Sequence, residues 1–362
     1  TGLTAIVIPD SVTCIAAEAF NNCTGLANVV IPAGVTTIGS SAFGNCTALT
    51  SIVLPDGITD IAASLFSGCT SLASIEIPEG VTAIGNSAFL NCTSLTAIII
   101  PDGVMAIGDY AFSDCSGLEG IVISSGVKRI GKRAFYNCSA LANVVIPNGV
   151  TDIDVLAFAN CSALETVVMG NRVASIGREA FSNCTALTGI ELPGSVRSIG
   201  TGAFGNCSAL SSIVVAGENA VYDSRDNCNA IIMTKNNTLL IGCKNSLIPG
   251  TVTAIGASAF ANCSALTDIV IPGSVTAIKN YAFRGCTGLT KIEIPNSVKT
   301  IGDYAFNNCT GLASAAIGNG VKSIGHYAFA NCSGIANIKL PDSVTSIGQH
   351  AFDGIAEVSY PE

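Results

Sequence analysis

Cysteine is the residue whose type and spacing in this sequence could carry chemistry. It recurs at a fixed interval, as at Cys23, Cys46 and Cys69, in segments such as "SNCTAL" at 182–187. A regular row of thiols could bind a metal, form disulfides, supply a nucleophile or fill a core. The cysteines that keep this interval, called here the cysteine column, are Cys23, Cys46, Cys69, Cys92, Cys115, Cys138, Cys161, Cys184, Cys207, Cys263, Cys286, Cys309 and Cys332.

The four roles of the cysteine column can be compared on geometry. Zinc needs ligands that converge, whereas parallel thiols do not, and the chain has only His326 and His350 to help. Residues stacked about 4.8 Å apart could approach a disulfide, but side chains in register keep their Cβ atoms wider apart than the roughly 3.5–4.5 Å required. A nucleophile needs an activating base, and in the last repeat the column ends in Ile355. The sequence therefore predicts reduced thiols in a core and no metal site.

Three cysteines lie outside the column. Cys14 occupies a position that we expect to point outward. Cys228 and Cys243 flank "NAIIMTKNNTLLIG", an apolar–turn–apolar pattern that predicts a β-hairpin. Whether these two cysteines pair across the hairpin stays open, because its register is not known.

A sequence repeat of the same length as the cysteine interval accounts for the spacing. The first copy runs from Thr1 to Cys23 and reads (T/S)-x-L-x-x-I-x-I-P-x-G-V-x-x-I-G-x-x-A-F-x-N-C as a consensus, and all 14 phenylalanines fall at position 20. A period of about 20–29 residues with Leu and Ile at strand spacing is typical of leucine-rich-repeat solenoids. The sequence predicts an α/β-type repeat solenoid, wound as a right-handed superhelix of about 15 turns. Each turn should hold one short parallel β-strand.

Individual positions of the repeat have physical roles. Positions 6 and 8 face one side of the predicted strand, and the proline at position 9 ends the strand because it has no N–H. Position 22 is Asn, Gly or Asp, the residues that best tolerate a left-handed backbone. We therefore expect a corner before each cysteine of the column.

The domain organisation follows from the repeat. We expect a single solenoid over 1–362, with nine regular repeats in 1–207, a stretched repeat in 208–240, five repeats in 241–355 and a C-terminal tail in 356–362. The stretched repeat holds the inserted hairpin. Residues 217–246 should leave the solenoid, and the chain should return in strand register at Ile248.

Composition excludes several classes of function. A net charge of −9 and a charged fraction of 11% argue against a general affinity for nucleic acid, which needs clustered Lys and Arg. No stretch approaches the roughly 18–20 apolar residues of a spanning helix. No signal peptide is visible and Thr1 is already in phase with the repeat, so the chain is interpreted as a trimmed mature domain. The missing signal peptide therefore does not decide whether the protein is exported.

Segments of the IPDGVTAIG and AFANCSAL type, which run through 1–355, resemble the BspA-like leucine-rich repeats of bacterial surface proteins. The resemblance implies an exported or surface-attached, extracellular protein that is not an enzyme. Characterised members of that family bind host matrix or plasma proteins, or other bacteria. The resemblance supplies no catalytic motif and no cofactor, and no motif defines the binding residues.

Two columns of outward residues could bind a protein partner. Position 7 alternates out of the strand, yet it is apolar in most repeats, and soluble monomers seldom leave such a strip bare. High β-propensity of valine is the alternative explanation. At position 18 aromatic residues follow one another near the C-terminus, and tyrosine is favoured at interfaces. The first candidate face is Val53, Ile99, Val122, Val145, Val168, Val214 and Val270, and the second patch is Tyr281, Tyr304, Tyr327 and His350.

The sequence leaves three functions to compare. Recognition of a protein partner, such as a host extracellular matrix or plasma protein, is favoured. A passive spacer that presents another domain is the alternative, and a glycan-binding module lacks a visible pocket motif. A basic spot at Lys128, Arg129, Lys132 and Arg133 could dock an acidic partner or be an ordinary solvated face.

Overall fold

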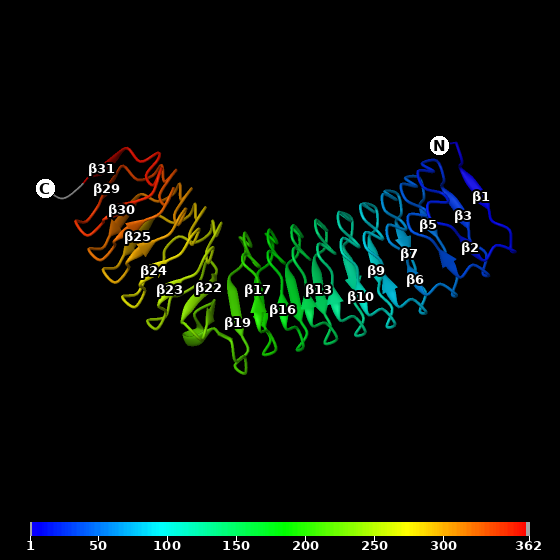
Figure 1. Ribbon diagram of the computed structural model, residues 1–362, viewed down its shortest axis with the longest axis horizontal. Helices are drawn as coiled ribbons and strands as arrows, with labels where there is room; N and C mark the ends of the chain where they lie inside the picture. The colour runs from blue at the N-terminus through cyan, green and yellow to red at the C-terminus, as the bar shows by residue number, and fades with distance from the viewer. Residues whose placement is uncertain (1, 360–362) are drawn as a thin grey trace. The chain divides into compact units, whose positions relative to one another are not determined.

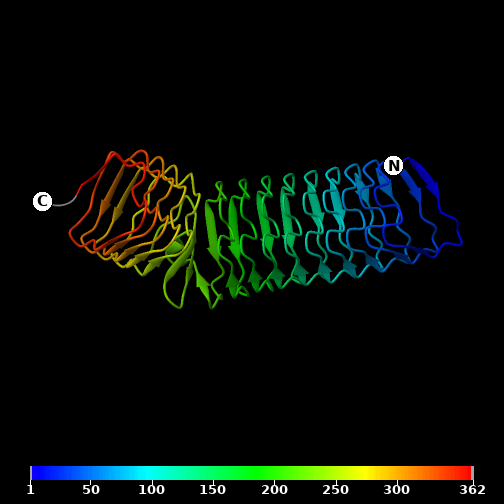
Figure 2. The same cartoon turned by 45° about the horizontal axis from the view of Figure 1, so that its top comes forward.

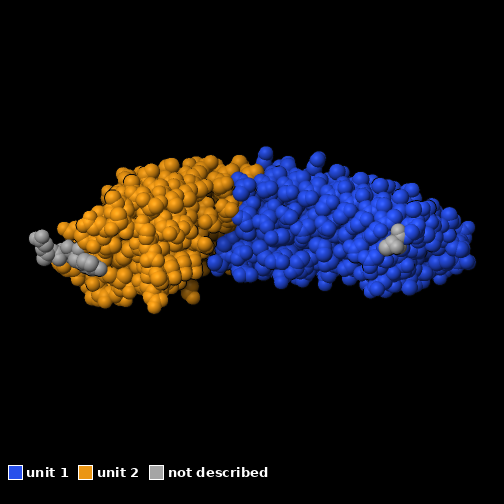
Figure 3. All heavy atoms as spheres, turned by 90° about the horizontal axis from the view of Figure 1, so that it is seen from above, with its two compact units in different colours: residues 1–185, 198–203 blue, residues 186–197, 204–362 orange. Residues whose placement is uncertain are grey.

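Residues 2–359 are described in a computed structural model, drawn as a ribbon in Figures 1 and 2. The chain divides into two compact units, coloured in Figure 3. Unit 1 comprises residues 1–185 and 198–203, and unit 2 comprises residues 186–197 and 204–362. Each unit is described by itself, and the prediction of one solenoid over 1–362 stays a prediction.

Unit 1 is a stack of turns, one for each sequence repeat, with two short strands in each turn. The first strand lies at positions 5–8 of the repeat and the second at positions 14–15. First strands are β1 (Ala5–Val7), β3 (Asn28–Val30), β5 (Ser51–Ile52), β7 (Ser74–Ile75), β9 (Ala97–Ile99), β11 (Gly120–Val122), β13 (Asn143–Ile146) and β15 (Thr166–Met169). Second strands are β2 (Cys14–Ile15), β4 (Thr37–Ile38), β6 (Asp60–Ile61), β8 (Ala83–Ile84), β10 (Ala106–Ile107), β12 (Arg129–Ile130), β14 (Asp152–Ile153), β16 (Ser175–Ile176) and β18 (Ser198–Ile199).

The strands of unit 1 pair in parallel with the equivalent strands of adjacent turns. Each residue pairs with the residue one repeat further along the chain, as Ala5 does with Asn28. Second strands from β6 to β18 form one sheet of seven, whereas first strands pair only two by two, β9 with β11 and β13 with β15 for example. The expectation of one strand per turn is therefore wrong. The α/β assignment is also wrong, since residues 2–359 contain no α-helix and only one 3₁₀ turn.

The core of unit 1 is built from columns of identical residues. The phenylalanines at position 20 are fully buried from Phe43 to Phe181, and their rings stack in parallel with centroids 5.0–5.9 Å apart from Phe20 to Phe181. Leucine at position 3 and isoleucine at position 15 close the core from the other sides, as Leu95 and Ile107 do. No turn could bury this surface alone, so adjacent turns supply one another's core.

Two positions in every regular repeat have positive φ. Position 22 does so as predicted, for example Asn91 at 60°, and position 18 does so as well, for example Tyr110 at 58°. The left-handed backbone at positions 18 and 22 directs the N–H groups of every second residue in this segment toward the carbonyl groups of the next turn. Glu18 N–H thus donates to Ser40 O of the next turn at 2.9 Å, and Asn22 N–H donates to Gly44 O at 2.7 Å.

Unit 2 is built from the same kind of two-strand turn, but an irregular segment lies at residues 222–242. First strands are β17 (Gly189–Leu192), β19 (Ser212–Val215), β25 (Lys291–Ile294), β27 (Ser314–Ile317), β29 (Asn337–Lys339) and β31 (Glu357–Ser359). Second strands are β23 (Ala254–Ile255), β24 (Ala277–Ile278), β26 (Thr300–Ile301), β28 (Ser323–Ile324) and β30 (Ser346–Ile347). After β19 the stretched repeat also contains β20 (Tyr222–Asp223), the 3₁₀ turn η1 (Arg225–Asn227) and β21 (Ala230–Met233), and β22 (Thr238–Gly242) begins in it and ends just beyond it.

The stretched repeat stays within the stack of unit 2. β21 and β22 pair antiparallel, and β22 also pairs in parallel with β23, joining Thr238 to Ala254. Ala230, Ile231 and Ile232 are fully buried. The expectation that 217–246 leaves the solenoid is therefore wrong, because apolar β21 and β22 bury their side chains by extending the sheet of second strands. The hand of the superhelix stays a prediction.

The last turn is shorter than the others. Ile355 N–H donates to Phe352 O at 3.0 Å, as Cys332 N–H does to Phe329 O, so Ile355 does occupy the column position. The next strand, β31, nevertheless begins at Glu357, directly after Ala356, whereas a longer connection separates Cys332 from the start of β29. β31 pairs with β29 in parallel. Residues 357–359, which belong to the expected tail at 356–362, thus form a first strand of the stack, and Val358 packs against the core.

Candidate recognition surfaces

The position-7 residues of unit 1 form an exposed apolar row, called here the valine strip. The neighbours at positions 6 and 8 are turned into the core, so alternation leaves position 7 outside. Val122, Val145 and Val168 expose 58–59% of their surface, although Val145 and Val168 are paired in register within one two-stranded sheet. The strip consists of Val7, Val30, Val53, Ile99, Val122, Val145 and Val168, with Glu76 at the same position between Val53 and Ile99.

Unit 2 carries the two remaining residues of the first predicted face. Val214 and Val270 are exposed, but charged residues take the same position on other turns, Glu191, Glu293 and Lys339. The structure therefore brings the predicted residues of unit 1 into one row. In unit 2, charged residues separate Val214 and Val270 from other exposed apolar residues at position 7. Charges on exposed strands are a common protection against self-association.

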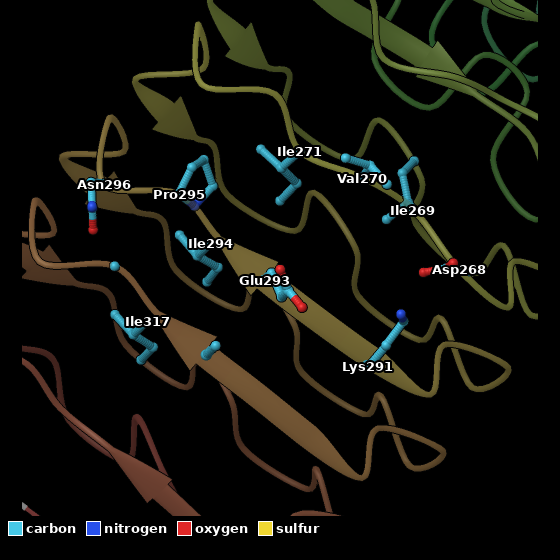
Figure 4. A pocket seen from close by; sticks show the side chains of 12 residues that line it. Asp268, Ile269, Val270, Ile271, Lys291, Glu293, Ile294, Pro295, Asn296 and Ile317 are labelled. Atoms are coloured by element: carbon cyan, nitrogen blue, oxygen red, sulfur yellow. The ribbon is translucent and has the colours of Figure 1, made fainter.

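A groove of about 450 Å³ lies on the first-strand side of unit 2 (Figure 4). It is lined by residues 268–271, by β25 and by β27, with β25 lying between the other two segments. Asp268, Lys291 and Glu293 place charges along it. Its apolar lining comes from all three segments and comprises Ile269, Val270, Ile271, Ile294, Pro295, Ala316 and Ile317. Sequence reasoning missed this groove. The available signal was the pair Lys291 and Glu293, which places opposite charges on both sides of buried Ile292 within one strand.

The second predicted patch is a stack of rings, called here the ring ladder. Tyr281, Tyr304, Tyr327 and His350 follow one another with centroids 4.8–5.0 Å apart and planes within 17° of parallel. All four have positive φ, so the position-18 corner aims each ring along the same row. The stack covers both faces of Tyr304 and Tyr327 and leaves their edges for contact. Desolvation in the stack and the adjacent phenols raise the pKa of Tyr304.

A polar ladder runs beside the rings at position 17. Asp303 N–H donates to Asn280 Oδ1 at 3.0 Å, His326 N–H donates to Asp303 Oδ1 at 2.8 Å, and Gln349 N–H donates to His326 Nδ1 at 2.9 Å. Nδ1 of His326 therefore serves as the acceptor for a backbone N–H of the next turn. The side chains of Asp303 and His326 are thus used to satisfy backbone groups, and they do not bond to each other as an acid–base pair would.

The cysteine column is a core element and not a reactive one. Each thiol from Cys46 to Cys184 is buried, and Cys69 Sγ donates to Phe43 O at 3.1 Å, a contact that recurs turn after turn. Burial raises the pKa of Cys46 to about 11 and those of Cys69 and Cys115 to about 12. A nucleophilic thiol needs a lowered pKa.

All 16 cysteines are unpaired in the structure, in line with the predicted reduced column. Cys14 is exposed as expected, and Cys228 and Cys243 are buried without a bond between them. Over residues 2–359, no group of three or more His, Cys, Asp or Glu could hold a metal ion. No helix in that part of the chain has the length and apolar character needed to cross a membrane.

The BspA type leucine rich repeat region matches residues 1–119, 105–230 and 241–359. A leucine-rich repeat protein from Bacteroides ovatus is similar in structure, with a TM-score of 0.73 and 29% identity over 99% of this chain and 92% of that chain. A leucine rich cell surface protein from Faecalibacterium prausnitzii shares 24% identity over 100% of this chain and 89% of that chain, at a TM-score of 0.46. No curated protein sequence matches the chain.

Proposed function

The chain belongs to the BspA-type leucine-rich repeat family, and from that premise we propose that it recognises proteins at a bacterial surface or in the extracellular space. Its partners would be host extracellular matrix or plasma proteins, and the contact would be made by the valine strip of unit 1. The family and the similar solved structures are leucine-rich repeat proteins, which supports a binding role over catalysis.

The observation that carries the proposal is the exposure of the valine strip. Val53, Ile99 and Val122 expose 58–81% of their surface, and within residues 2–168 the strip is interrupted only at Glu76. Contiguous apolar surface on a soluble protein marks an interaction site. Small residues at position 5, such as Ser51 and Gly120, lie beside the strip and leave room for a partner's side chains.

A triple substitution in the strip tests the proposal. Val122→Lys, Val145→Lys and Val168→Lys remove apolar contact worth about 25 cal/mol per Å² and would place charges against any apolar partner surface. Because all three side chains are exposed, melting should change little. The binding of the full chain to a panel of purified matrix and plasma proteins should fall by at least tenfold for any partner captured by the wild type.

The matched control removes the ring ladder instead. Tyr281→Ser, Tyr304→Ser and Tyr327→Ser alter three residues of unit 2 and leave the valine strip intact. Loss of binding only in this tyrosine variant would move the site to the ring ladder. If the chain captures no member of the panel, or if both variants bind like the wild type, a spacer role becomes the better explanation.

A further inference from the structure

The basic spot of unit 1 is divided by the structure into paired and unpaired charges. Arg129 lies between two carboxylates, 3.0 Å from Asp109 and 2.6 Å from Asp154, so it is neutralised within the fold. Within residues 2–359, none of the ion pairs involves Lys128, Lys132 or Arg133. A chain of net charge −9 thus has three cations without an ion pair in a single repeat, of which Lys132 and Arg133 share the ring of Tyr110.

Two tyrosines hold Arg133 in place. Its guanidinium carbon lies 5.6 Å from the ring centre of Tyr110 and 5.1 Å from that of Tyr136, and Lys132 Nζ lies 5.9 Å from Tyr110. Cation–π contacts of this kind are attractive within about 6 Å. We call Tyr110, Lys132, Arg133 and Tyr136 the arginine clamp. It fixes the orientation of Arg133 before any ligand arrives, which lowers the entropy cost of binding.

The outer edge of Arg133 is open. Its Nε is fully buried and has no hydrogen-bond partner. Its two terminal nitrogens also form no hydrogen bond, but they are not fully buried. They therefore keep some solvent-accessible surface, and their unused N–H groups can donate in parallel to a carboxylate. Two nearby acids are bonded to other groups and form no ion pair with Arg133. Asp109 is occupied by Arg129 and by Lys132 N–H at 3.0 Å, and Asp114 accepts from Asn137 at 2.9 Å.

We propose that the arginine clamp binds carboxylate side chains of an acidic polypeptide segment; the proposal rests on the proposed recognition of proteins and adds the chemistry of the partner. The two cations that share the ring of Tyr110, Lys132 and Arg133, suit one or two carboxylates. An extended polyanionic polysaccharide would need a longer basic track and would be repelled by the negative remainder of the chain.

Peptide binding by the full chain tests the clamp. A fluorescein-labelled tetraglutamate peptide should bind, as measured by anisotropy, and a tetraglutamine peptide should not. The variant Lys132→Gln, Arg133→Asn should weaken tetraglutamate binding at least tenfold, and Asn suits the positive φ of residue 133. The control Lys299→Gln, Lys322→Gln removes the same charge from exposed positions in unit 2 and should change binding less than twofold.

Three results would overturn the proposal: equal losses in the two double variants, no loss in either, or tighter binding of a heparin-derived decasaccharide than of tetraglutamate through the same residues. Lys132→Gln alone, at an exposed residue, gives the same test if Arg133→Asn perturbs folding, with a loss of about threefold expected. The peptide assay does not use the valine strip. A negative result here therefore leaves the proposed function standing, and failure of the strip experiment leaves the clamp standing.

Discussion

At the residue scale, the cysteine column shows how one side chain can serve packing and hydrogen bonding together. Phe43 O accepts from Cys46 N–H of its own turn at 3.3 Å and from Cys69 Sγ of the next turn at 3.1 Å. Alanine would leave a cavity and make no such contact, and valine would add bulk without a donor. A thiol is small, apolar and a weak donor, which suits this position.

The raised thiol pKa values predict a loss of stability at high pH. In the folded chain the pKa is about 11 for Cys46 and about 12 for Cys69, Cys115 and Cys161, because burial disfavours the thiolate. The unfolded value is near 9.0. The thiols therefore support the fold fully below pH 9. Above it the unfolded chain releases protons that the folded chain keeps, and each such thiol lowers the unfolding free energy by about 1.4 kcal/mol per pH unit.

Urea unfolding measured at pH 7, 8.5, 9 and 10 checks this prediction. The midpoint should change little up to pH 8.5 and fall steeply between pH 9 and 10. The variant Cys69→Ala should be less stable at pH 7, and its unfolding free energy should fall less steeply with pH, by up to about 1.4 kcal/mol per pH unit, the contribution of one thiol. A profile that is flat to pH 10 would contradict the buried, protonated column.

At the element scale, composition revealed one corner of the repeat and concealed the other. Position 22 is Asn, Gly or Asp, so its left-handed backbone could be predicted. Position 18 is occupied by residues as different as Glu18, Leu156 and Tyr304, yet it also has positive φ. Hydrogen bonds to the next turn impose that conformation, and a tertiary requirement of this kind leaves no residue signature. The second strand was missed because two residues are too short to show alternation.

The corner at position 22 predicts an unusual order of stability. Asn91 is exposed and has a φ of 60°. Alanine in the left-handed region costs roughly 1–2 kcal/mol, whereas glycine loses only about 0.5–1 kcal/mol through its flexible unfolded state. Asn91→Gly should therefore be more stable than Asn91→Ala by about 0.5–1 kcal/mol in urea unfolding. At exposed Ser74, in strand β7, the order should be reversed, with the alanine variant more stable than the glycine variant.

At the scale of the whole molecule, the sequence predicted the stacking but not every pairing partner. The fixed period of the repeat indicates which residues lie above one another, so the phenylalanine column and the valine strip could be assigned from residue numbers alone. The pairing of Thr238 with Ala254 joins residues that are closer in sequence than one repeat, so it follows no period. The groove beside Lys291 and Glu293 depends on the separation of neighbouring first strands, which the period does not encode. Regular parts were thus predictable, and irregular parts required the structure.

Within unit 1, each turn bonds to its immediate neighbours, so stability should respond locally to a core substitution. Phe135 stacks on Phe112 at 5.2 Å and on Phe158 at 5.1 Å. Phe135→Ala should cost about 3–5 kcal/mol through lost burial and a cavity. The hydrogen bonds nearest the cavity, such as Phe112 N–H to Ala134 O and Phe135 N–H to Ala157 O, should open most often.

Hydrogen–deuterium exchange of the full chain measures that response peptide by peptide. Peptides that contain residues 112, 135 and 158 should exchange faster in Phe135→Ala. A peptide that contains Phe43, three turns before the phenylalanine at 112, should keep its wild-type rate. The control Val122→Ala alters an exposed residue on the same turn and should leave every rate near the wild-type value. A uniform increase across unit 1 would show instead that its turns unfold as one cooperative body, because a nearest-neighbour stack must lose protection around the substituted turn first.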